Sequence, residues 1–415
     1  MRDSMNESGA GEAAPRSSLA AKPSDIRGGP TETIESLQIL RFFAALVVVL
    51  DHCKFVGSAL ADRVGLAFTF PSFHGRLGVD IFFVISGFIM VHISSGRDEW
   101  STPPGVFAVD RISRIVPIYY IATATWVALF LGAGFLNSRN VDSPWPPSEY
   151  VLSALFIPYL DPITKLPQPV LPQGWTLDYE MFFYMLFAVA LTFTRARGIK
   201  CLLLAFVGLA VAGQLWNMIA GNVFVLTPLK EAPGAQYFTV PRFWFHPIIL
   251  EFLAGVGLAL LRGRLIVIGV LASFRYTTVV LIALIGAYMC AYNAEVFSES
   301  ALDALRVSLA IGAVSICVLT RDIAPKSKLR NLSVECGNAS YSLYLCHVHI
   351  LFIMTSVWRR LGVATMGVGS FVVVSLAVCL VAGLLTYRTL EKPLSRYLRR
   401  MLRARMQPRL AVTVR

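Results

Sequence analysis

The amino-acid sequence predicts an all-α integral membrane protein with about ten transmembrane helices and both termini in the cytoplasm. Hydrophobic residues make up 56% of the chain and charged residues only 15%, an apolar share well above that of a soluble domain. The apolar runs are continuous rather than alternating, so they favour helices, which satisfy their own backbone hydrogen bonds inside a bilayer. Lysine and arginine gather in alternate connections, and the positive-inside rule then places both ends of the chain inside.

The expected spans fill almost the whole chain. The polar residues 1–33 are typical of a disordered tail. Residues 34–393 are expected to form one transmembrane domain, and the basic residues 394–415 a cytoplasmic tail on anionic lipid. No secretory signal peptide is expected, because the first apolar run begins only after the polar tail. The ten spans are expected at residues 37–56, 77–93, 115–135, 176–194, 199–219, 247–261, 277–291, 304–320, 341–358 and 368–385.

The charge and the cysteine content give no indication of nucleic-acid binding, of a disulfide framework or of a metal site. The formal net charge is +12, but cations in the inner connections of a membrane protein account for it without nucleic-acid binding. Most of the seven cysteines lie within apolar runs and show no metal-ligand spacing. We therefore expect neither a disulfide framework nor a bound metal.

The first span carries ionisable side chains in an otherwise apolar run. Arg41 and His52 lie eleven positions apart, so at about 100° per residue both leave the same helix face, about 16 Å apart along the axis. An ionisable residue in a membrane segment is costly and indicates function by default. The alternative is that Arg41 extends to the headgroups and His52 lies at the opposite interface.

A histidine and several carboxylates are expected at one depth, near the outer surface. His52 lies near the outer end of the first span and Asp80 about one turn inside the second. Asp178 and Glu180 lie at the start of the fourth span. Because a carboxylate can orient a histidine as a general base, we expect His52 to be the catalytic base and Asp80 or Glu180 to orient it. Structural hydrogen bonding between helices is the alternative.

A second polar group is expected at the inner surface. Arg111 and Arg114 lie one helical turn apart, where two planar guanidinium groups suit a phosphate, and Arg41 lies at the same depth. Ser340, Tyr344 and His347 open the ninth span from this side and would line a polar passage. The alternatives are inner-surface anchoring and interhelical hydrogen bonds. A ligand with a phosphorylated head and a long thin arm, such as acyl-coenzyme A, fits this path.

The connection between the third and fourth spans, residues 136–175, contains many prolines and so cannot be one continuous helix. Its aromatic residues predict an ordered cap at the outer surface, where flat rings stack on sugars or form an interfacial belt. Trp175 and the nearby Asp178 are the residues that we expect to contact an acceptor substrate.

Five motifs in this order resemble those of the acyltransferase-3 family of membrane O-acyltransferases, particularly the branch linked to bacterial exopolysaccharide production. The resemblance covers about residues 34–393. The motifs are Arg41 and His52 with ten residues between them, Gly78-Val-Asp-Ile-Phe-Phe-Val-Ile-Ser-Gly-Phe88, Arg111-x-x-Arg114, Trp175-x-Leu-x-x-Glu180 and Ser340-Tyr-Ser-Leu-Tyr344.

The resemblance implies acetyl-coenzyme A as the acyl donor, His52 as the essential base, and Arg111 and Arg114 as contacts of the coenzyme phosphates. In the fourth span this chain reads Leu177-Asp-Tyr-Glu-Met, where many relatives carry two adjacent acidic residues. This departure leaves open whether Asp178 shares the role of Glu180.

We therefore expect a multi-pass inner-membrane O-acetyltransferase that transfers an acetyl group from cytoplasmic acetyl-coenzyme A to a hydroxyl of a surface polysaccharide or its lipid-linked precursor. His52 would take the proton of that hydroxyl, in direct transfer or by way of an acyl-histidine. Two other functions fit the same polar residues. One is a transporter or flippase of a lipid-linked glycan with a proton relay, and the other is a non-catalytic scaffold in an export complex.

Overall fold

The computed structural model describes the chain between residues 34 and 410, with several gaps. Residues 1–33, and most of the span expected at 277–291, lie outside the described residues. The described ranges are 34–70, 75–96, 99–136, 143–219, 243–267, 298–319 and 327–410, with a few helical residues between 283 and 292.

Helices make up nearly all of the regular structure in these ranges, where strand pairing is limited to two isolated bridges. The short elements are α4 (Pro147–Ala154), the 3₁₀ turn η2 (Pro172–Gly174), α11 (Lys328–Asn338), α13 (Val363–Met366) and the π-helical turn η4 (Tyr387–Glu391). The long helices are α1 (Glu35–Arg63), α2 (Arg76–Ser94), α3 (Pro104–Leu136), α5 (Trp175–Ala190), α6 (Arg195–Ile219), α8 (Ile249–Val267), α10 (Glu299–Leu319), α12 (Ser340–Leu361), α14 (Val368–Thr386) and α15 (Lys392–Leu410).

Six helical segments of the described chain are long and apolar enough to cross a bilayer, which confirms an all-α membrane protein. They are α2, α3, α6, α10, α12 and the continuous segment formed by α14 and α15. Helix α1 is not among them and carries Arg41, Asp51 and Lys54 along its apolar stretch. Helix α5 has only 16 residues, about 24 Å of helix against roughly 30 Å of hydrocarbon. The number of ten spans stays a prediction.

Helix α2 packs against α1, α8 and α10 in the interior of the bundle. It comes closest to α8 at two glycines. A Cβ atom on Gly87 would lie 2.0 Å from the carbonyl oxygen of Phe252, and one on Gly255 would lie 2.0 Å from the carbonyl oxygen of Val84. Because only glycine permits such an approach, these two positions hold the backbones of α2 and α8 together.

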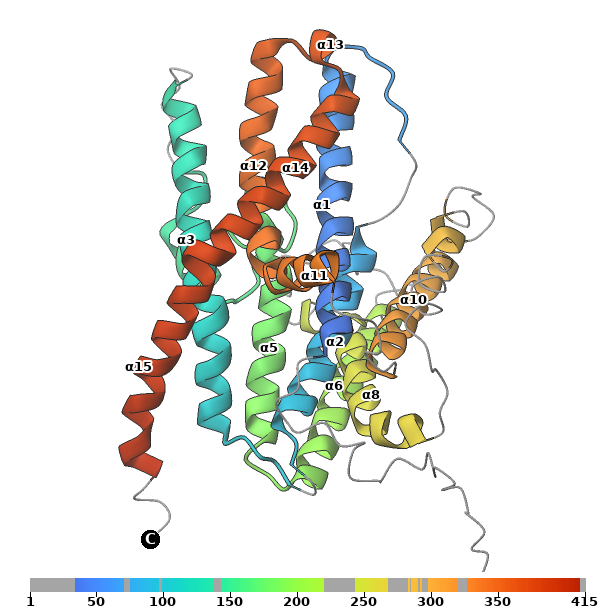
Figure 1. The fold of residues 1–415 in the computed structure, drawn as a ribbon, viewed down its shortest axis with the longest axis vertical. Helices are drawn as coiled ribbons and strands as arrows, with labels where there is room; N and C mark the ends of the chain where they lie inside the picture. The colour runs from blue at the N-terminus through green and yellow to red at the C-terminus, as the bar shows by residue number, and fades with distance from the viewer. Residues whose placement is uncertain are drawn as a thin grey trace, which may run out of the picture.

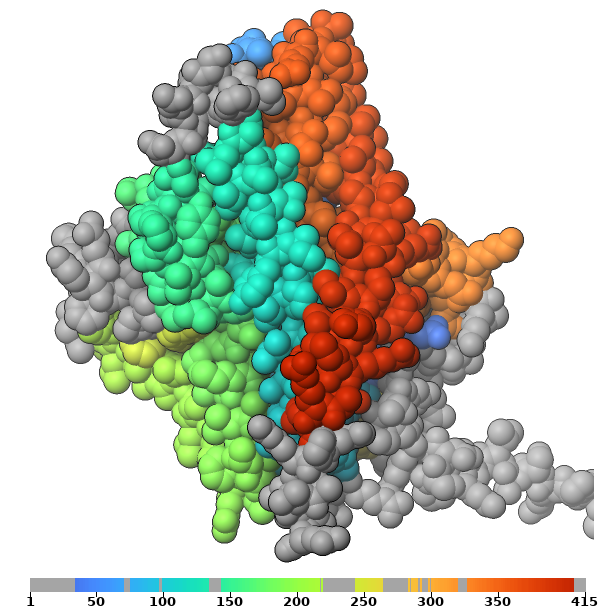
Figure 2. All heavy atoms as spheres, turned by 90° about the vertical axis from the view of Figure 1, so that its left-hand side faces the viewer, coloured from blue at the N-terminus to red at the C-terminus, as the bar shows by residue number. Residues whose placement is uncertain are grey.

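Helices α12 and α14 lie beside α1, and the chain continues from α14 through η4 into α15 (Figure 1). Figure 2 shows α15, in red, lying along α3, in teal. The Arg403 guanidinium donates two hydrogen bonds to the Asp110 carboxylate, at 3.0 and 2.5 Å. The basic residues beyond 394, expected as a tail on lipid, are thus helical as far as residue 410 and pack on α3. Their contact with lipid stays a prediction.

The connection before α5 enters the bundle. Leu171 and Gln173 are buried, and the Gln173 side-chain amide donates to the carbonyl oxygen of Leu345 on α12 at 2.8 Å. Further back in the connection, the buried indole of Trp145 donates to Asp161 at 2.8 Å and so has a structural role. Helix α5 consequently begins inside the bundle and not at its surface.

Candidate active site

Two cavities lie on either side of a thin wall in the bundle. The smaller one, of about 90 Å³, lies among α1, α2, α3, α5 and α12. The larger one, of about 380 Å³, lies among α1, α3, α12 and the connection before α5. The wall contains Tyr344, whose hydroxyl donates to the carbonyl oxygen of Gln173 and accepts from the hydroxyl of Thr176, both at 3.0 Å. Tyr344 lines the smaller cavity and Gln173 the larger, so their hydrogen bond joins the linings of the two cavities.

Three arginines from two helices converge on the smaller cavity. Arg111 and Arg114 come from successive turns of α3, and Arg41 comes from the beginning of α1. Arg41 is buried and donates to the Gln38 side chain at 3.2 Å. The Arg111 guanidinium lies 5.5 Å from the centre of the Phe107 ring, so the aromatic face supports it. Planar guanidinium groups in this arrangement suit an anion such as phosphate.

The five residues expected to contact the donor all line this one cavity, although they come from three helices far apart in sequence. They are Arg41, Arg111, Arg114, Ser340 and Tyr344. Apolar side chains of α2 form another part of its lining. A cavity with cations on one part of its wall and apolar side chains on another fits a ligand that has both anionic groups and a slender arm.

His52 lines the larger cavity. It is half-buried, and its Nδ1 lies 2.6 Å from Nε2 of His347 on α12. The planes of the two rings are within 12° of parallel and their centres are 4.9 Å apart, which fits an edge-to-edge hydrogen bond. Trp175 lines the same cavity. The structure therefore brings the expected base and one expected acceptor contact together.

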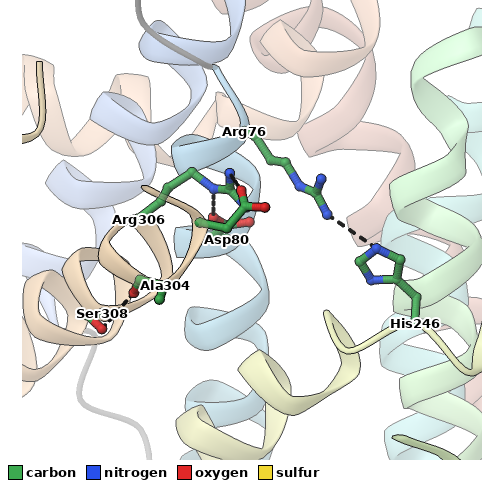
Figure 3. Close-up of polar contacts among 7 residues, drawn as sticks. Arg76, Asp80, His246, Ala304, Arg306 and Ser308 are labelled. Atoms are coloured by element: carbon green, nitrogen blue, oxygen red, sulfur yellow. Dashed lines mark hydrogen bonds and ion pairs between the residues drawn. The ribbon is translucent and has the colours of Figure 1, made fainter. Parts of the chain in front are cut away.

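Asp80 does not orient His52, and the sequence expectation is corrected here. The Asp80 carboxylate accepts a hydrogen bond from Nε of Arg306 on α10 at 2.5 Å. Figure 3 shows this buried pair, with the nearby Arg76 side chain pointing to His246, 3.4 Å away. The spacing of residues predicts how far along a helix a side chain lies, but it does not predict which neighbouring helix that side chain meets.

Glu180 and Asp178 also lie away from the expected position. Glu180 lines the smaller cavity and accepts a hydrogen bond from Tyr184, one turn further along α5. Asp178 is buried and lines neither cavity, and its carboxylate oxygens have no hydrogen-bond partner among the described residues. The sequence placed both at the depth of His52 because a span was expected to begin at the surface, whereas α5 begins inside. A role for Asp178 in acceptor binding stays a prediction.

Two further buried residues lie in this region. His347, which the sequence placed only in a polar passage, contacts His52 from another helix. Glu391 was not singled out from the sequence. Glu391 accepts a hydrogen bond from the Ser342 hydroxyl at 2.6 Å and has two arginines of the smaller cavity as charged neighbours. Each is an ionisable residue within or at the end of a membrane helix, which is the sequence signal that marks it. Glu391 also lies in a π-helical turn, a feature frequent at functional sites.

The chain is similar over most of its length to proteins of one kind. A family model described as an acyltransferase domain matches residues 34–387. The chain is 34% identical to the exopolysaccharide production protein ExoZ of Rhizobium meliloti, over 81% of this chain and 93% of that protein. It is 26% identical to the acyltransferase MdmB of Streptomyces mycarofaciens, over 88% and 93%. It is 24% identical to the peptidoglycan O-acetyltransferase OatA of Listeria monocytogenes, over 78% and 50%. No solved structure matches it.

Proposed function

Because the chain belongs to the acyltransferase domain family, we propose that it is a membrane O-acetyltransferase that uses acetyl-coenzyme A to acetylate a hydroxyl of a surface polysaccharide or its lipid-linked precursor. The observation that carries this proposal is the pair of adjoining cavities, one cationic and one containing His52. The enzyme would lie in the inner membrane, with the donor reaching it from the cytoplasm.

The smaller cavity supports the choice of donor. Coenzyme A carries phosphates at one end and the reactive thioester at the end of a slender arm. Arg111 and Arg114 would hold the phosphates together with Arg41, and the arm would point towards Tyr344 in the wall. For the thioester to reach His52, the hydrogen bonds of Tyr344 in this wall would have to open.

The larger cavity supports a sugar hydroxyl as the acceptor. His52 would take the proton of the hydroxyl while the hydroxyl oxygen attacks the carbonyl carbon of the thioester. The carbon–sulfur bond then breaks, coenzyme A leaves as a thiolate, and His52 returns the proton to that thiolate. Trp175 offers a flat ring against which a sugar can stack. The printed names of ExoZ and OatA refer to an exopolysaccharide and to peptidoglycan, which also supports a glycan acceptor.

The test is the release of coenzyme A from acetyl-coenzyme A by the purified protein with membrane glycolipids added. Replacing His52 with alanine removes the base and is expected to lower turnover by at least about 10²-fold, while binding of acetyl-coenzyme A is retained. Arg63→Ala, at an exposed position in the last turn of the same helix and outside both cavities, is the control. The double variant Arg111→Ala/Arg114→Ala is expected mainly to raise KM for the donor.

Wild-type turnover in His52→Ala would contradict the proposed role of this residue. If the wild-type protein neither binds nor consumes acetyl-coenzyme A, the transferase proposal fails. Movement of a labelled lipid-linked glycan without acetyl-coenzyme A would then favour the transporter.

A further inference from the structure

His347 is a fully buried histidine whose two ring nitrogens are both engaged. Its Nδ1 lies 2.6 Å from the carbonyl oxygen of Tyr344, in the preceding turn of α12. Its Nε2 lies 2.6 Å from Nδ1 of His52 on α1. His347 lines neither of the two cavities. It is therefore placed to act on His52 and not on a substrate.

The partner atoms determine where the protons of the two rings lie. A carbonyl oxygen only accepts hydrogen bonds, so Nδ1 of His347 must carry a proton. A neutral imidazole has one N–H group, so Nε2 of His347 is then a bare acceptor. Nδ1 of His52 must supply the proton between the two rings, and Nε2 of His52 is left with a free lone pair. This assignment follows from the hydrogen-bond network.

The surroundings support the neutral form of His347. A charged imidazolium buried in the bundle would need an anionic partner. The hydrogen-bond partners of the His347 ring among the described residues are a backbone carbonyl and a second histidine, and the Tyr344 ring lies beside it. Asp51, the carboxylate next to His52 in sequence, is instead bound to Lys54 at 3.0 Å. The two hydrogen bonds therefore run in one direction: Nδ1–H of His52 donates to Nε2 of His347, and Nδ1–H of His347 donates to the carbonyl oxygen of Tyr344.

We propose that His347 is the positioning residue for the base: it holds His52 in the tautomer that is protonated at Nδ1 and keeps its Nε2 unprotonated. This inference rests on the proposed function, since it assigns His52 its active form. It gives His347 the role expected at first for Asp80 or Glu180. A neutral imidazole fixes the tautomer and ring orientation by hydrogen bonding alone, without the negative charge of a carboxylate.

The first test measures the tautomer directly and needs no turnover. The full-length protein is prepared with ¹⁵N-labelled histidine, and the His52 nitrogen signals are assigned by their loss in His52→Gln. We expect His52 in the wild-type protein to be protonated at Nδ1 and bare at Nε2, and to become a mixture of tautomers in His347→Leu. A wild-type His52 protonated at Nε2, or a tautomer unchanged by His347→Leu, would overturn the inference even if the protein were inactive.

The second test separates positioning from packing. His347→Gln can place an oxygen acceptor near the position of Nε2, whereas His347→Leu removes the acceptor at similar size. We expect His347→Leu to lower kcat by about 10²-fold or more with KM for acetyl-coenzyme A nearly unchanged, and His347→Gln to recover most of the loss. Equal kcat values in these two variants, or a wild-type kcat in His347→Leu, would show that the hydrogen bond to His52 is not used.

A matched control lies two positions further along α12. His349 is also buried, but its ring nitrogens lie 2.8 and 3.1 Å from the carbonyl oxygens of Ala122 and Leu345, and it lines neither cavity. His349→Gln is expected to keep both the wild-type tautomer of His52 and the wild-type kcat. If it lowered kcat as much as His347→Leu does, loss of packing in α12 would explain both variants and the inference would fail.

Discussion

At the scale of single residues, carboxylates balance the cations of the smaller cavity. Arg41 and Arg114 each have Glu180 and Glu391 as charged neighbours. Buried guanidinium groups lying this close to one another would repel and would also lose hydration. The two carboxylates reduce that cost while leaving cationic groups on the cavity wall for an anionic ligand.

Glu391→Gln tests this balance, because it keeps the size of the side chain and removes its charge. The change leaves the neighbouring arginines with less compensation and weakens the hydrogen bond from Ser342. We expect the free energy of unfolding in detergent to fall by about 1–3 kcal/mol. Glu335→Gln is the control, because the Glu335 carboxylate pairs with Arg388 at a more exposed position and such a pair is worth about 1 kcal/mol or less. Equal effects of both changes would argue against a specific role of Glu391.

The three arginines that line the smaller cavity were predictable from the sequence, whereas Glu180 in the same lining and the partner of His52 were not. Arg41, Arg111 and Arg114 are cations in or beside apolar runs. The predicted topology puts all three at the inner surface of the membrane and therefore near one another. The contact between His52 and His347 joins residues 295 positions apart in the chain. Helix periodicity does not predict such a pairing, because it depends on how α1 and α12 are rotated towards each other.

At the scale of elements, the contact between α2 and α8 depends on backbones that nearly touch. Gly255→Ala would place a Cβ atom 2.0 Å from the carbonyl oxygen of Val84, so the backbone of α2 or of α8 would have to shift to accommodate it. We expect a loss of at least about 1–3 kcal/mol in the free energy of unfolding.

Gly257→Ala on the same helix is the matched control for this prediction. A Cβ atom there has no neighbour within 4 Å, and alanine is a better helix former than glycine. We expect the control to unfold at or slightly above the wild-type temperature in the same detergent. A Gly255→Ala protein as stable as Gly257→Ala would show that α2 and α8 do not pack this closely.

The helices were predictable, but the point at which one of them begins was not. Continuous apolar runs predicted α1, α2, α3, α6, α10, α12 and α14 in their correct order. The same signal placed the fourth span at the outer surface, because a connection is normally outside the bundle. Here Leu171 and Gln173, in the connection before α5, are buried in the bundle. Tertiary contacts of this kind leave no periodic pattern in the sequence.

At the scale of the whole molecule, the proposed function assigns the smaller cavity to the donor and the larger one to the acceptor. Such a division suits an enzyme whose donor is made in the cytoplasm and whose acceptor is presented on the other face of the membrane. The wall that contains Tyr344 would keep coenzyme A from leaking across while the acceptor is absent. The proposed path therefore requires that the two cavities open to opposite faces of the membrane.

Single cysteines introduced at Arg111, on the smaller cavity, and at Gln168, on the larger one, test this arrangement. The exposed Cys201 is replaced with serine in both proteins, and the parent without a new cysteine gives the background. With a membrane-impermeant maleimide, we expect Arg111→Cys to react only in inside-out vesicles and Gln168→Cys only in right-side-out vesicles. Reaction of both from one face would mean that donor and acceptor enter from the same side, and the path through the wall would then be wrong.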